Sequence, residues 1–137
     1  LGAPSRATAR RVQGLLSHRL PAGLLLVPSL EYREAMGENA GFPLDLKALV
    51  PRLRAEKGNF FGGRAFAEYG LHWLHGTGEG GYFVTEGFRR GVTHRLEAVA
   101  QSAPHNNLHL NANWLARLEP GAAAWTQRMS AEVRAVF

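Results

Sequence analysis

The sequence of 137 residues contains no cysteine, and Asp45 is its only aspartate. The absence of cysteine excludes disulfide bonds, thiolate chemistry and cysteine-based zinc sites, and it says little about the compartment. With one aspartate and no serine in a nucleophile-elbow pattern, the sequence gives no support to a catalytic triad.

Long apolar runs are also absent. The longest, residues 20–30, is interrupted by Pro21, Gly23 and Pro28 and falls short of the roughly 20 residues that a membrane helix requires. The sequence therefore predicts no membrane span. With 45% apolar residues the chain has enough material for one hydrophobic core, which favours a single domain.

Basic residues are plentiful, and they are unevenly placed. The net charge is +5, and all but two of the 16 basic residues are arginines. Residues 1–30 carry four arginines and no acid. Arginine is well shaped for phosphate contacts, so a polyanionic partner is one interpretation, and the coding bias of a GC-rich genome is the other. The basic, acid-free beginning also suggests an organellar transit segment, with an ordinary basic helix as the alternative.

Apolar residues recur at helical spacing, and we expect an all-α fold with a single helical domain. In residues 60–75 one stripe holds Phe66, Tyr69, Gly70, Trp73 and Leu74. Further helices are predicted at residues 6–20, 29–36, 43–53 with a kink at Pro51, 85–99 with a break near Gly91, and 121–137.

Three short patterns are candidates for a chemical role. His72 and His75 have helical spacing for a shared metal, but they lack an acidic third ligand, so no metal site is expected. The glycine-rich residues 76–81 lack a phosphate-loop lysine and are interpreted as a linker. The polar residues 105–109 suit either an RNA contact or a simple turn.

Four blocks of the sequence resemble the ribonuclease III family, in the family's order. EKGNFFGGRAF at residues 56–66 is similar to the signature helix, and residues 46–54 precede it as in the family. Residues 92–100 and 131–137 resemble two later helices, the last cut before its glycine. The four blocks cover roughly residues 44–137, and the resemblance implies a ribonuclease III-like helical domain at residues 31–137, truncated at its C-terminus. The basic, acid-free residues 1–30 are expected to form an N-terminal arm or helix.

The resemblance also implies that the family's carboxylate cluster is lost. The positions that match it are vestigial: Glu56, Asn59, Gly63, Ala131 and Arg134. One carboxylate of five cannot hold the hard divalent cations that the family's reaction uses. We therefore expect a non-catalytic protein with no metal and no other cofactor.

Degenerate domains of this kind resemble structural proteins of the mitochondrial large ribosomal subunit. This likeness implies a location in the mitochondrial matrix and, as partners, ribosomal RNA and other mitoribosomal proteins, including a second ribonuclease III-like protein. The candidate RNA-binding residues are Arg6, Arg10, Arg11, Arg89, Arg90 and Arg95. The candidate partner interface consists of Phe60, Phe66, Tyr69 and Trp73.

Two other classes remain open at this point. One is an accessory structural subunit of another mitochondrial complex, such as the ATP synthase or the respiratory chain. The other is an active nuclease or a nuclease partner, against which the lost carboxylates argue.

Overall fold

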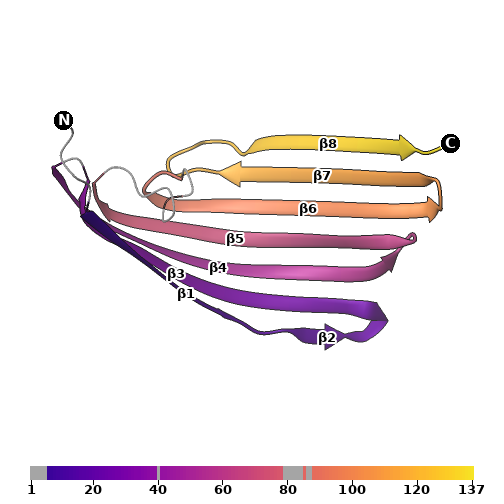
Figure 1. The fold of residues 1–137 in the computed structure, drawn as a ribbon, viewed down its shortest axis with the longest axis horizontal. Coiled ribbons are helices and arrows are strands. Elements are labelled where there is room, and N and C mark those ends of the chain that lie inside the picture. Colours follow the sequence, from indigo (N-terminus) through magenta and orange to yellow (C-terminus); the bar gives the residue numbers. More distant parts are fainter. Residues whose placement is uncertain (1–5, 40, 79–84, 86–87) are drawn as a thin grey trace.

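The protein is a single-layer antiparallel β-sheet, as a computed structural model that describes residues 6–39, 41–78, 85 and 88–137 shows (Figure 1). About 80% of the described residues are in strands. The predicted all-α fold is therefore wrong, and so is each helix predicted within the described residues.

The sheet follows the order β1-β3-β4-β5-β6-β7-β8, and β2 pairs with β3 beside β1. One short 3-10 turn, η1 (Pro21–Gly23), joins β2 to β3. The strands are β1 (Arg6–Leu15), β2 (His18–Leu20), β3 (Leu24–Asn39), β4 (Phe42–Phe60), β5 (Gly63–Thr77), β6 (Gly91–His105), β7 (Leu108–Leu118) and β8 (Thr126–Ala135).

The sequence of β5 explains why the helical interpretation failed. Apolar residues four and eight positions apart fall on one side of both a helix and a strand, so Phe66, Gly70 and Leu74 satisfy either pattern. Tyr69 and Trp73 complete a helical stripe, but in the strand they lie on the opposite face. The strand is decided by pairing along β4 and β6, which a local pattern does not contain.

Pro51 also contributed to the wrong helical prediction. Pro51 was expected to kink a helix, and instead it lies inside β4, where it pairs with Leu30 of β3. A proline has no amide hydrogen to donate, and the β4–β5 register skips Val50 and Pro51. Pairing over the rest of this 19-residue strand outweighs that local loss.

Two rows of paired residues define the two faces of the sheet. One row places Pro28, Leu53, Tyr69, Leu96 and Ala116 side by side across β3 to β7. We call the face that carries it the apolar face. The adjacent row lies on the opposite side, which we call the polar face, and consists of Ser29, Arg52, Gly70, Arg95 and Arg117.

The buried core lies on the polar face. Its aliphatic cluster occupies the end of the sheet near the β3–β4 turn and consists of Ala35, Leu44, Leu46, Ala48, Val50 and Leu74. Four polar side chains on the same face are also buried, namely Glu31, Arg33, His72 and Thr93. Ala116 is the exception among buried strand residues, because it faces the other way.

Connections between the strands are short where the structure describes them. Residues 106 and 107 form the β6–β7 turn, so the polar residues 105–109 belong to a turn and the ends of two strands. The predicted glycine-rich linker at residues 76–81 lies partly outside the described residues, as do residues 86 and 87 of the predicted helix after Thr85. The predicted boundary between residues 30 and 31 falls inside β3.

Gly76 shows how closely the strands approach. It adopts a φ of +120°, and a Cβ atom there would lie 1.9 Å from the backbone oxygen of Asp45.

We expect Gly76→Ala to lower the free energy of unfolding by about 1–3 kcal/mol or more, and urea titration measures the change. Gly14→Ala is the control, because nothing lies within 4 Å of its added Cβ, and its effect should stay below about 1 kcal/mol. Equal effects of the two variants would contradict this packing.

Candidate functional site

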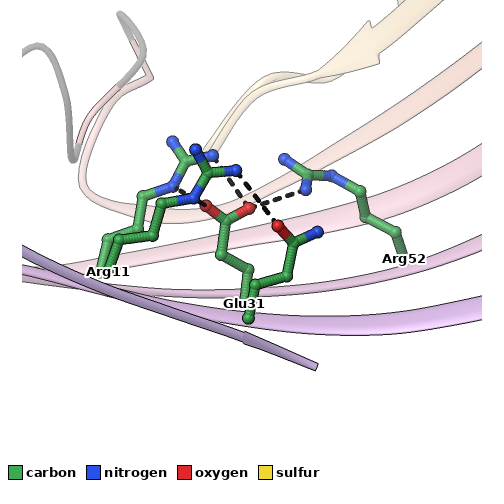
Figure 2. Close-up of polar contacts among 5 residues, drawn as sticks. Arg11, Glu31 and Arg52 are labelled. Atoms are coloured by element: carbon green, nitrogen blue, oxygen red, sulfur yellow. Dashed lines mark hydrogen bonds and ion pairs between the residues drawn. The ribbon is translucent and has the colours of Figure 1, made fainter. Parts of the chain in front are cut away.

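The polar face is organised around a buried carboxylate. Glu31 of β3 has a relative exposure of 0% and is contacted by the guanidinium groups of Arg11, Arg33 and Arg52 (Figure 2). Arg33 donates from Nε to Oε1 at 2.6 Å and from Nη2 to Oε2 at 3.0 Å. Arg52 donates from Nη1 to Oε2 at 2.8 Å. Residues from β1, β3 and β4 are thus joined at one point.

The cluster has an electrostatic signature. Burial alone raises the pKa of Glu31, but the hydrogen bonds from Arg33 and Arg52 outweigh it and lower the pKa from 4.5 to about 2. Glu31 is therefore ionised at neutral pH. A buried charge of this kind is stable only while its partners remain in place.

A side chain from the β5–β6 connection covers part of the polar face. Phe88 is 8% exposed, and its ring lies 4.4 Å from the ring of His72. The guanidinium of Arg117 lies 4.4 Å from the centroid of the same ring, in cation–π geometry. Arg89 and Glu119 form an ion pair at 3.7 Å beside it. Phe88 therefore packs against the polar face.

The apolar face is exposed across nearly the whole sheet. Leu30 is 52% exposed, Leu53 50% and Trp73 49%, and on β8 Met129 and Val133 reach 78% and 69%. In the single-layer sheet of Figure 1, no second layer of described residues covers this face. Two charged side chains, Glu31 and Arg33, are thus buried on one face while large apolar side chains are exposed on the other, which departs from the usual arrangement in a water-surrounded protein.

Polar atoms on the apolar face are paired with one another. The Tyr69 hydroxyl lies 2.7 Å from Nδ1 of His94, and the ring of Trp125 lies 6.2 Å from the His94 ring. Trp114 donates from Nε1 to Oε1 of Gln127 at 3.3 Å. These pairs reduce the number of hydrogen bonds that the face would need from its surroundings.

A charged row forms one border of the apolar face. Arg10, Glu34, Lys47 and His75 are paired side by side across four strands. The next row inwards is apolar and aromatic, and it contains Val12, Tyr32, Leu49, Trp73 and Val92. The polarity of the face therefore changes within two residues along each strand.

The apolar face also has a hollow of about 490 Å³. It is lined by alanines that adjacent strands place in two neighbouring rows, together with Leu24, Trp114 and Met129. The alanines are Ala55, Ala65, Ala67, Ala98, Ala100 and Ala112. Small side chains here leave room for another molecule to approach the backbone.

The vestigial positions taken from the ribonuclease III resemblance do not form one cluster. Gly63 and Arg134 line the same open cavity of about 700 Å³, whereas Glu56 forms an ion pair with Arg54 at 3.0 Å and lies outside it. Asn59 has a φ of +53° next to the β4–β5 turn. Ala131 lies on the apolar face of β8, opposite Ala112.

The candidate RNA-binding arginines are also divided. Arg6 and Arg10 are paired with residues on the apolar side of β3, whereas Arg11 points to Glu31 on the polar face. Arg89 and Arg90 belong to the β5–β6 connection. Arg95 lies in β6 and donates to Glu97 at 2.9 Å. These residues do not share one surface.

The candidate partner interface is split as well. Tyr69 and Trp73 are on the apolar face, where they are 38% and 49% exposed. Phe66 is on the polar face, with the Arg54 guanidinium 3.7 Å from its ring centroid, and Phe60 ends β4. His72 and His75 likewise lie on opposite faces, because three positions in a strand reverse the side. Among the described residues, no group of three His, Cys, Asp or Glu could hold a metal ion.

Sequence reasoning missed the Glu31 cluster and the continuous apolar face. The available signal was the spacing of Glu31 and Arg33 around Tyr32, since a spacing of two indicates one face of a strand. Arg52 could not be assigned to them from sequence, because it lies on another strand.

Comparison with known proteins gave no match: no family model, no curated protein and no solved structure is similar to this chain. The ribonuclease III resemblance therefore stays a prediction, although the helical fold that it implied is wrong. Within the part of the chain that the structure describes, no helix is both long and apolar enough to pass through a membrane.

Acid should weaken the Glu31 cluster. Because the pKa of Glu31 is lowered on folding, the stability it contributes is present above about pH 4.5 and is lost as the pH falls towards 2. We expect Glu31→Gln to cost about 3–5 kcal/mol at pH 7 and to flatten this part of the stability curve. Urea titrations between pH 2 and 7 measure both effects.

Glu56→Gln is the matched control, because the Glu56 side chain is 41% exposed and its ion pair with Arg54 is at the surface. Its cost should stay below about 1 kcal/mol. A Glu31→Gln curve that runs parallel to the wild-type curve would show that Glu31 does not carry the acid sensitivity.

Proposed function

We propose that this chain forms a sheet embedded in a lipid bilayer, with the apolar face against lipid hydrocarbon and the polar face turned away from lipid. One observation carries the proposal. The fully buried Glu31 lies on one face, while Leu53, Met129 and other large apolar residues are exposed on the other. An apolar surface of this extent marks a contact with a partner or a membrane.

The apolar surface has the dimensions of a bilayer core. On β7 it runs from Leu108 to Leu118, a strand of 11 residues. At about 3.4 Å per residue such a strand is about 37 Å long, and a tilt of about 45° reduces its span to about 26 Å. On β3 and β5 the corresponding stretches cover residues 24–32 and 65–73. About 9–11 tilted residues are what a strand needs to cross hydrocarbon.

The borders and the internal pairing support lipid over a protein partner. The charged row of Arg10, Glu34, Lys47 and His75 lies directly outside the row that contains Tyr32 and Trp73. Aromatic residues next to charges are typical of the boundary between hydrocarbon and lipid headgroups. The paired Tyr69 and His94 meet the requirement that polar groups in hydrocarbon be satisfied within the protein.

The polar face supplies what the opposite side of such a sheet needs. Arginines outnumber carboxylates on it, and many are paired with a glutamate, as Arg95 is with Glu97 and Arg54 with Glu56. These pairs suit a surface in contact with water or with other polar groups of the protein. The proposed role is therefore that of a sheet across the membrane whose arginine-rich face is turned away from lipid.

The mitochondrial ribosomal role stays a prediction, because nothing in the structure favours it. The arginines on which it rested lie on different faces, and several are engaged with glutamates of the chain itself.

Tryptophan fluorescence tests the bilayer proposal. In single-tryptophan variants reconstituted in phosphatidylcholine vesicles, we expect Trp114, in the middle of the β7 apolar stretch, to be quenched most by lipids brominated deep in the acyl chains. Trp73, next to the charged row, should be quenched most by bromines near the headgroups. Emission that no brominated lipid quenches, in protein that does not float with the vesicles, would exclude the proposal.

A pair of adjacent arginine substitutions gives a second test. Ala112 and Asn113 are neighbours in β7, both exposed, and they face opposite sides of the sheet. In vesicles we expect Ala112→Arg to lower the free energy of unfolding by about 2–4 kcal/mol, because it places a charge in hydrocarbon. Asn113→Arg should change it by less than about 0.5 kcal/mol. Urea titration in vesicles measures both, and equal effects would mean that the two faces meet the same solvent.

A further inference from the structure

The edge strand β8 (Thr126–Ala135) is unprotected. All of its residues are exposed, and its one partner in the sheet is β7. It contains no proline and its pairing with β7 has no bulge. A strand of this kind presents a row of unpaired backbone donors and acceptors to any second strand that can align with it.

The opposite edge differs in charge. β1 carries Arg6, Arg10 and Arg11 and no acid. If two copies of β1 paired antiparallel about their middle with faces matched, either Arg10 or Arg11 would meet its own copy. Like charges placed directly opposite disfavour such pairing. The two edges are therefore not equivalent.

We propose that β8 pairs antiparallel with β8 of a second copy of this chain, about a two-fold axis at Ser130. The inference rests on the proposed function in one respect, since hydrocarbon offers no partner to an open strand edge. It rests independently on the charges of β8, which are complementary in this register.

The register follows from the sequence of the strand. With Ser130 opposite Ser130, Arg128 lies opposite Glu132 of the second copy, and the two-fold axis forms this pair twice. Met129 lies opposite Ala131 of the second copy, so the apolar face continues across the junction. Within one copy Arg128 has the uncharged Leu115 opposite it on β7, and Glu132 forms an exposed ion pair with Arg134 at 3.2 Å. The second copy therefore places a carboxylate opposite Arg128.

Because the chain has no cysteine, a single introduced thiol reports the contact without background. In vesicles containing the full chain, we expect Ser130→Cys to give a covalent dimer on oxidation with copper phenanthroline or with a short bis-maleimide. Ala9→Cys on β1 is the matched edge control, because it keeps all three arginines of that strand, and it should give at least tenfold less dimer. A Ser130→Cys protein that stays monomeric, or one that in mixed samples cross-links only to the Ala9→Cys variant, would overturn the proposal.

Charge exchange tests the register. In the Ser130→Cys background, Glu132→Arg places Arg128 opposite a second arginine and should reduce the dimer yield at least tenfold. Adding Arg128→Glu restores the opposite charges and should restore the yield. A double variant that dimerises no better than Glu132→Arg alone would overturn the register and with it the proposal.

The same vesicle samples separate this inference from the proposed function. Tryptophan quenching without cross-linking would leave the sheet in lipid and remove the β8 pairing. Cross-linking of protein that does not float with vesicles would retain the pairing and remove the bilayer.

Discussion

Antiparallel pairing imposes a strict condition on this chain: each side chain shares its face with the residue opposite it on the neighbouring strand. Six successive pairings from β1 to β8 carry the condition across the whole sheet. A shift of one residue at any strand would place its charged residues among the apolar ones. The row of Arg52, Arg95 and Arg117 and the adjacent row of Leu53, Leu96 and Ala116 show that the register is kept throughout.

The Glu31 cluster gives this condition an energetic basis. A carboxylate with 0% exposure is costly to desolvate, and it is tolerated because three arginines from three strands surround it. A slipped register between β1, β3 and β4 would leave that charge without partners. The cluster therefore adds less to the net stability of this register than it takes from the stability of other registers.

The chemistry of the two faces indicates which environment the sheet requires. A single layer whose described residues leave one face uncovered must bury that face against something outside itself. The charged border row and the paired polar atoms within the apolar face are both consistent with lipid as that covering. The two edges of the sheet are open as well. β8 offers complementary charges to a further strand, whereas the charged side chains of β1 are arginines alone.

By itself, the sequence determined the absence of thiol chemistry and the basic net charge, and it left residues 105–109 open between a turn and an RNA contact. It did not determine the strands, because Phe66, Gly70 and Leu74 fit a helix and a strand equally, and Pro51 argued against a strand. It grouped Tyr69 and Trp73 with Phe66 as one interface, whereas Phe66 lies on the other face. Only the tertiary structure decided which arginines meet Glu31 and which apolar residues form one surface. The physical reason is that both depend on the register between strands, and hydrogen bonds between distant segments set that register.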